Sequence, residues 1–161
     1  MSALLLLALA LAPAAWSVSA DPVDALAARY PDFHAEAIPA AGCKVKRCAG
    51  CWFKSKKPAE IDKQGRKTFL RFGFGYSEYP DAAAAAQAFE LVKTDYADPD
   101  PYSKAPEYMR LEGARIYTLH GACLLAGKRW KKLLADVDAI LGPTKPGAAG
   151  GCGCGTGCRM N

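Results

Sequence analysis

Residues 68–76, Thr-Phe-Leu-Arg-Phe-Gly-Phe-Gly-Tyr, carry the clearest strand pattern in the sequence. Their apolar side chains alternate with other residues, as in a β-strand that buries one face. Gly73 and Gly75 lie on the opposite face and leave a flat spot, which allows a backbone, a helix or a ligand to approach closely. Packing is the commoner reason for such glycines. The apolar face comprises Leu70, Phe72, Phe74 and Tyr76.

Two further segments have clear helix signals at their ends. Residues 21–30 begin with Asp21 as a cap and Pro22 at the first helical position, which predicts a short N-terminal helix. Residues 128–141 form a strongly amphipathic helix that Gly142 ends.

The segment 82–96 is rich in alanine and follows Asp81, a favoured helix cap. Phe89, Val92 and Tyr96 recur on one face of the predicted helix. We expect this helix to pack on the apolar face of the strand at 68–76.

Short apolar runs at 108–111, 114–119 and 122–126 are separated by Glu112-Gly113 and by His120-Gly121. A glycine in each gap suits a hairpin turn, so the runs predict two or three antiparallel strands. The segments 32–42 and 54–67 read as irregular and mostly loop, respectively.

The predicted fold class is therefore α+β, because strands and helices do not alternate as βαβ units. We expect a small antiparallel sheet with two amphipathic helices, 82–96 and 128–141, on one face. The short helix at 21–30 precedes them. Residues 21–142 form one domain, and the Gly-, Ala- and Cys-rich residues 143–161 form a disordered tail.

Residues 1–20 have the pattern of a secretory signal peptide. An apolar run of Leu and Ala at 4–11 precedes Pro13, and Val18-Ser19-Ala20 places small residues before a cleavage site. We expect a mature chain that begins at Asp21, is secreted or periplasmic, and has no transmembrane segment, because no other apolar stretch is long enough. Frequent Ala, Gly and Pro indicate a bacterial source.

The chain contains seven cysteines, and four of them belong to the predicted domain. Export makes disulfides the expected state. We expect one bond inside the cluster at 43–51 and one long bond to the sheet, although four cysteines allow three connectivities. The disulfide candidates are Cys43, Cys48, Cys51 and Cys123.

Two other uses of the cluster stay open. Cys48-Ala-Gly-Cys51 is a Cys-x-x-Cys pair near cations, as in redox proteins, but Trp52 follows the pair and no βαβ unit surrounds it. The spacing from Cys43 to Cys51 is similar to that of plant-type ferredoxin loops, with Cys123 as the fourth ligand for a cluster or for zinc.

The tail holds Cys152, Cys154 and Cys158 among glycines. These thiols are candidate ligands for a soft metal, or they form intermolecular disulfides. Gly151-Cys152-Gly153-Cys154 resembles the opening of MYXO-CTERM sorting tails, which continue into a membrane helix and an Arg cluster that the residues up to Asn161 lack. The resemblance covers the tail alone.

Charge is distributed unevenly along the chain. Residues 43–71 contain ten Lys or Arg against two acids, whereas residues 78–112 contain eight acids against three bases. The basic stretch with its aromatic residues predicts a loop that binds an anionic ligand or envelope surface, such as lipid head groups, acidic polysaccharide or nucleic acid. The alternative is a solvated loop. The anion-binding candidates are Lys44, Lys46, Arg47, Trp52, Lys54, Lys56 and Lys57.

No hydrolase, phosphate-loop or zinc-protease motif occurs in the sequence. We therefore assign no catalytic residue and no cofactor. The composition favours an exported, disulfide-stabilised, non-enzymatic binding or accessory module of the cell envelope. The alternative is a periplasmic thiol-redox or metal-handling protein that uses Cys48 and Cys51 or the tail cysteines.

Overall fold

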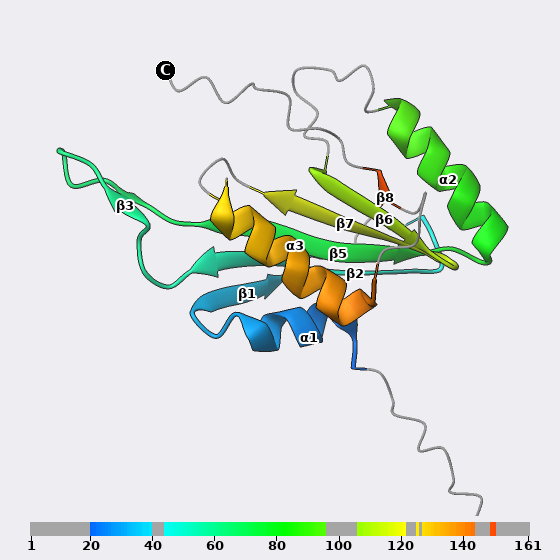
Figure 1. Ribbon diagram of the computed structural model, residues 1–161, viewed down its shortest axis with the longest axis horizontal. Coiled ribbons are helices and arrows are strands. Elements are labelled where there is room, and N and C mark those ends of the chain that lie inside the picture. The colour runs from blue at the N-terminus through cyan, green and yellow to red at the C-terminus, as the bar shows by residue number, and fades with distance from the viewer. Residues whose placement is uncertain are drawn as a thin grey trace, which may run out of the picture.

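The computed structural model describes residues 20–39, 44–95, 106–121, 125, 127–143 and 149–150. These residues form an α+β fold with an antiparallel main sheet, as the sequence predicts (Figure 1). The elements are α1 (Pro22–Arg29), β1 (Phe33–Ala37), β2 (Arg47–Ser55), β3 (Glu60–Ile61), β4 (Lys67–Thr68), β5 (Arg71–Glu78), α2 (Ala82–Asp95), β6 (Tyr108–Glu112), β7 (Arg115–Gly121), α3 (Lys128–Leu141) and β8 (Ala149–Gly150).

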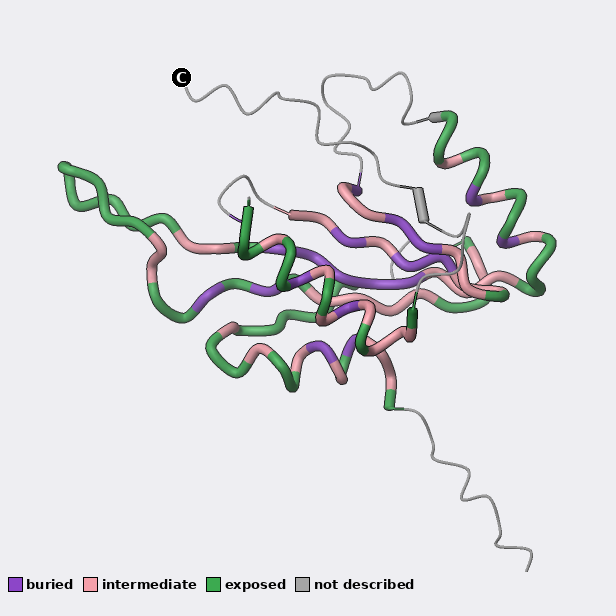
Figure 2. Tube along the Cα trace, viewed as in Figure 1, coloured by how far each residue is buried: buried purple, intermediate pink, exposed green. Residues whose placement is uncertain are grey.

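The main sheet has the strand order β1-β2-β5-β7-β6-β8, and every neighbouring pair is antiparallel. The strand predicted from 68–76 is β5, which lies between β2 and β7. Residues 72–76 are all buried, and Figure 2 shows β5 as the most continuously buried strand. The most apolar stretch of sequence therefore forms the middle of the sheet.

One face of the sheet carries the larger core, which α1 and α3 cover (Figure 1). Phe53 of β2 stacks on Phe72 of β5 with 4.4 Å between ring centroids, and Leu133 and Val137 of α3 pack against the same cluster. The prediction that Phe72 and its neighbours form an apolar face is confirmed, as is the amphipathic helix at 128–141.

The N-terminal helix is anchored by polar contacts as well as by its buried apolar side. Asp21 caps α1 by accepting a hydrogen bond from the Val23 amide at 2.9 Å, which confirms the predicted cap. The Tyr76 hydroxyl also donates to Asp21, at 2.8 Å. At the other end of α1, the Tyr30 hydroxyl donates to Asp136 of α3 at 2.8 Å. These contacts connect α1 to both β5 and α3.

The prediction that α2 packs beside α3 is wrong, because α2 covers the opposite face of the sheet (Figure 1). Phe89 of α2 packs with Met109 of β6 and Ile116 of β7 in a second, smaller cluster. Side chains at odd and even positions of a strand point to opposite faces, and Tyr117 and Leu119 belong to the larger core. The apolar stripe of α2 therefore finds its partners on β6 and β7.

Two neighbouring strands, the edge strand β1 and the adjacent β2, differ from the prediction. The region expected to be irregular contains β1, which pairs with β2 along its whole length. The cysteine segment, expected to be a loop, forms most of β2, and Arg47–Lys54 pair with β5. Alternate positions Cys51, Phe53 and Ser55 face the core side, and this two-residue period stabilises the strand.

Beyond the main sheet, β3 and β4 form a two-stranded extension that we call the basic arm, residues 56–68 (Figure 1). Ser55 holds its base, because its buried hydroxyl donates to the Lys57 carbonyl at 2.7 Å and accepts from the Leu70 amide at 3.1 Å. At the tip, hydrogen bonds from the Arg66 amide and side chain lower the pKa of Asp62. The region predicted as mostly loop is thus an ordered hairpin.

The hairpin of β6 and β7 is confirmed, with Gly113 in the turn at φ +56°. His120 and Gly121, expected in a second turn, instead belong to β7 and pair with β5. Residues 122–124 and 126 lie outside the described residues, so the third predicted run is not tested.

The fully buried Arg110 of β6 binds the end of α3. It donates to the Gly142 carbonyl at 2.7 Å and forms ion pairs with Glu112 and Asp138. Two residues of the predicted tail form β8, which pairs with β6. Within the described part of the chain, no helix is long and apolar enough to span a bilayer.

Candidate binding surface

The second face of the sheet is covered by α2 only over β6 and β7, and a hollow of about 220 Å³ lies on its remaining part. The strand register places the relevant positions in cross-strand rows. Trp52, Gly73 and His120 form one row across β2, β5 and β7. In the next row toward α2, Gly50 pairs with Gly75. We call this part of the sheet the open face.

Glycines form the floor of the open face and allow its strands to approach closely. A Cβ atom added at Gly75 would lie 2.7 Å from the Ala49 carbonyl oxygen and 3.0 Å from the Gly50 Cα. These contacts are shorter than real Cβ atoms tolerate, so only glycine fits at Gly75 without moving β2. The flat spot predicted from Gly73 and Gly75 is confirmed.

Trp52 lies across the open face, and 47% of its surface is exposed. A Cβ atom at Gly73 would lie 2.8 Å from Cζ3 of the indole, so the six-membered ring of Trp52 sits on the Gly73 backbone. The His120 ring lies on the other side of the row, with 6.1 Å between the two ring centroids. The structure therefore fixes one side of an indole and leaves much of the ring accessible.

The hollow has both apolar and polar walls. Burial lowers the pKa of His120, with a smaller opposing effect from Glu107, so the imidazole is uncharged at neutral pH. The Ser77 hydroxyl lies 3.8 Å from the Cys48 sulfur. The residues whose side chains line the hollow are Ile38, Pro39, Cys48, Trp52, Ser77, Thr118 and His120.

The predicted anion-binding residues do not form a single patch. Lys46 and Arg47 lie at one end of β2, where Lys46 pairs with Glu78 at 3.1 Å and Arg47 pairs with Asp21 at 3.5 Å. Lys44 is exposed beside them. Acidic partners thus neutralise much of the charge at this end.

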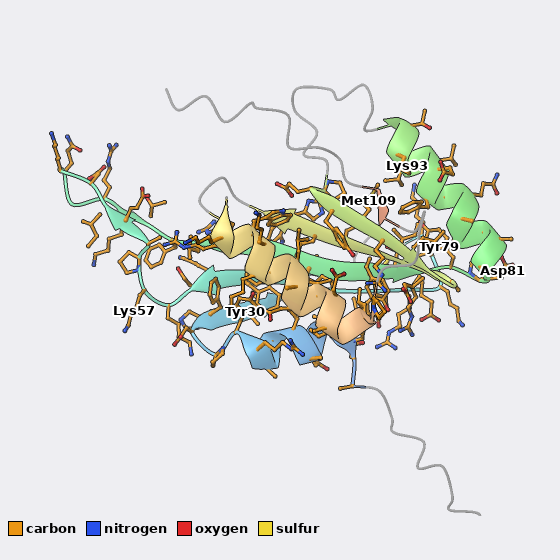
Figure 3. The ribbon with its side chains drawn as sticks, viewed as in Figure 1. Tyr30, Lys57, Tyr79, Asp81, Lys93 and Met109 are labelled. Atoms are coloured by element: carbon orange, nitrogen blue, oxygen red, sulfur yellow. The ribbon has the colours of Figure 1, made fainter. Side chains whose placement is uncertain are left out.

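The other predicted cations lie at the opposite end of β2, about 23 Å from Arg47 at the usual rise of a strand. Lys54, Lys56 and Lys57 are all exposed here, and Figure 3 shows Lys57 at the base of the arm. The Lys54 ammonium lies 4.6 Å from the centroid of the Phe69 ring, and Lys56 donates to the Pro31 carbonyl. No described carboxylate forms an ion pair with these three lysines.

Charge continues along the basic arm, which is mostly exposed, with only Pro58 and Ala59 half-buried (Figure 2). The arm contains five Lys or Arg and two acids. Asp62 is engaged by Arg66, and Ile61 is 61% exposed between Glu60 and Asp62. The sequence groups these cations by their proximity along the chain, whereas β2 separates Lys46 and Arg47 from the basic residues of the arm. These arm residues are Lys56, Lys57, Lys63, Arg66 and Lys67.

The strand geometry of β2 argues against a Cys48–Cys51 redox pair. Residues three apart in a strand point to opposite faces, and their Cα atoms lie about 10 Å apart. A disulfide needs Cα atoms within about 7 Å. Cys48 lines the hollow on the open face, whereas Cys51 packs against the larger core. The two sulfurs therefore cannot act as one Cys-x-x-Cys centre in this fold.

Cys51 is a free thiol, which differs from its prediction as a disulfide candidate. Burial, followed by the charges of Asp24 and Asp21, raises the pKa of this thiol. Cys43, Cys123 and the tail cysteines lie outside the described residues, so the disulfide connectivity and the metal site of the tail stay predictions. Among the described residues, no group of three or more His, Cys, Asp or Glu could hold a metal ion.

Comparisons with known proteins find no matching family model, curated protein or solved structure. The candidate surface is therefore assigned from its own geometry. Sequence reasoning named Trp52 but missed Thr118 and His120, because only the pairing of β5 with β7 places them beside it. The flat spot at Gly73 and Gly75 was the one signal for the hollow.

Proposed function

We propose that the protein is an exported, disulfide-stabilised, non-enzymatic binding module of the bacterial cell envelope, and that it contacts an anionic partner through the basic arm. One observation carries the proposal: the arm extends beyond the sheet, and its lysines are exposed without described acidic partners (Figure 3). Clustered cations that are not neutralised by neighbours attract anions and accelerate their association.

Two further features support a binding role. The β2–β5 hairpin anchors the arm to the most buried strand of the sheet, so the cations are held at a defined place. A thiol-redox role would need Cys48 and Cys51 together, and β2 places them on opposite faces. A metal-handling role of Cys152, Cys154 and Cys158 is a separate prediction.

Retention on a heparin matrix tests the proposal. We expect the full chain to elute at a higher salt concentration than a variant that carries Lys57→Gln, Lys63→Gln and Lys67→Gln. All three lysines are exposed on the arm, so the substitutions remove three charges without disturbing packing.

A matched control removes the same charge elsewhere. Lys93→Gln, Lys128→Gln and Lys131→Gln change exposed positions on α2 and α3, outside the predicted anion-binding residues. We expect this control to elute close to the unmodified protein. Equal losses of retention in the two triple variants would show that net charge, and not the arm, controls binding, and would refute the proposal.

A further inference from the structure

We infer that the open face binds a uronic acid unit of an acidic polysaccharide, with its sugar ring on Trp52 and its carboxylate at Lys54 and Arg71. This inference rests on the proposed anionic partner and names its chemical class. Three groups of observations carry it: the held indole, the small polar hollow beside it, and a pair of like charges in the next row.

The indole of Trp52 provides a platform for a ring. Its six-membered ring sits on the Gly73 backbone, so the side chain is supported from below while 47% of its surface remains exposed. An exposed indole face gains contact energy from the flat C–H face of a sugar ring at little conformational cost, because its own position is already held.

The hollow lies on the other side of Trp52 from Lys54 and Arg71, and it has the size and polarity for the adjoining sugar unit of the chain. Its volume of about 220 Å³ is below the roughly 300–1,000 Å³ of pockets for drug-sized ligands. Ser77 and Thr118 contribute hydroxyl groups, and His120 contributes an uncharged imidazole. Such groups donate and accept hydrogen bonds from sugar hydroxyls.

The row on the opposite side of Trp52 from Gly50 and Gly75 carries an unfavourable pair of charges. Lys54 of β2 lies directly opposite Arg71 of β5, and both are exposed. Like charges directly opposite each other destabilise a strand pair, and no described carboxylate forms an ion pair with either residue. An anion held between them would relieve the repulsion.

The two features lie at a spacing that one sugar unit spans. Trp52 and Lys54 are two residues apart on the same face of β2, which separates them by about 7 Å along the strand. A carboxylate attached to a ring on Trp52 lies within reach of the flexible Lys54 side chain. The ring and the anion are therefore recognised by neighbouring rows.

The side chains of the hollow favour a sugar over a nucleobase. Base edges are read mainly by Arg, Asn and Gln, which form paired hydrogen bonds with them. The described residues that line the hollow include none of these. Only the Trp52 side chain there offers an exposed indole, and its polar neighbours are small hydroxyl groups.

Binding of a galacturonic acid hexamer to the full chain tests the inference, with maltohexaose as the neutral hexamer. The readout is the indole N–H signal of Trp52 in a ¹H–¹⁵N spectrum, assigned with Trp52→Phe. We expect the acidic hexamer to shift this signal and to bind at least tenfold more tightly than maltohexaose.

Variants separate the inference from the proposed function. We expect Trp52→Ala to weaken hexamer binding about tenfold, and Lys54→Gln with Arg71→Gln to remove the preference for the acidic hexamer. The arm variant with Lys57→Gln, Lys63→Gln and Lys67→Gln should still shift the Trp52 signal. The exposed Leu91→Ala serves as a control that leaves binding unchanged.

Two outcomes would overturn the inference. In the first, the hexamer binds without shifting the Trp52 signal, Trp52→Ala binds it with unchanged affinity, and the arm variant no longer binds it. This result would keep the proposed function and remove the open-face site. The other is a Trp52 shift with a six-nucleotide thymidine strand and none with the acidic hexamer, which would identify a nucleic-acid site.

Discussion

Replacing Gly75 with Ala should destabilise the protein far more than replacing Gly73 with Ala. Both glycines lie on β5 and face the same side of the sheet, so the two variants receive the same methyl group in the same type of strand. They differ in what the methyl group meets. At Gly75 it meets the backbone of β2, and at Gly73 it meets the Trp52 side chain.

The contact distances set the expected magnitudes. The new Cβ at Gly75 would lie 2.7 Å from the Ala49 oxygen, whereas ordinary contacts begin near 3.4 Å. The two central strands must therefore separate by several tenths of an ångström, and overpacking of this kind costs about 1–3 kcal/mol. For a domain of this size, each kcal/mol lowers Tm by roughly 3–6 °C.

The clash at Gly73 is also short, at 2.8 Å from Cζ3 of Trp52. However, the half-exposed indole can turn away from the sheet, so the free energy of unfolding should fall by less than about 1 kcal/mol. Gly73→Ala should instead shift the indole N–H signal of Trp52 and change its fluorescence.

Urea unfolding followed by circular dichroism gives the free energy of unfolding for each variant. Equal losses for Gly73→Ala and Gly75→Ala would refute the reasoning, because the backbone contact at Gly75 would then have no special cost. An unchanged Trp52 signal in Gly73→Ala would show that the indole does not rest on this glycine.

Other predictions concern the supporting structure. Arg110→Met removes the buried guanidinium that binds the end of α3, so urea unfolding should show a free energy of unfolding lower by roughly 2–4 kcal/mol. A decrease of less than about 1 kcal/mol would contradict this role. Burial raises the pKa of Asp136, but a neighbouring ammonium and phenol outweigh it and hold that pKa below its ordinary value. Asp136→Asn should therefore destabilise the protein at pH 7, and the difference should shrink as pH falls below about 4; a constant difference would count against the ion pair. Cys51 should react slowly with iodoacetamide until urea unfolds the protein, because burial raises the pKa of its thiol.

Elements with strong local patterns were predictable from the sequence. The caps and periodicity of α1, α2 and α3 depend on neighbouring residues, and the alternation in β5 is complete within one stretch. Helix termini and strand periods are local properties, so no knowledge of the partner was required.

The missed elements depend on distant partners. In β2 the core-facing positions include Cys51 and Ser55, which differ little in polarity from their neighbours, and only Phe53 is strongly apolar. The alternation of apolar and polar residues is therefore weak in this strand. The strand forms because β5 pairs with it. The apolar stripe of α2 predicts a helix but does not show on which face of the sheet the helix packs. The second face also carries apolar residues, such as Met109 and Ile116, and α2 packs there.

The candidate site was predictable only in part. Trp52 and the arm lysines were visible as an aromatic residue among cations, and the two glycines indicated a flat spot. The register placed Lys54 opposite Arg71 and brought His120 to Trp52, and pairings between strands cannot be read from one stretch of sequence.

The salt dependence of heparin binding tests the central claim, that the basic arm holds an anionic partner, most directly. When basic side chains bind a polyanion, they release the counterions that surround it. The logarithm of the binding constant therefore falls linearly with the logarithm of the salt concentration, with a slope proportional to the number of ionic contacts. We expect the slope to become shallower by about 1 to 3 in the variant with Lys57→Gln, Lys63→Gln and Lys67→Gln. A slope equal to that of the unmodified protein would contradict the claim.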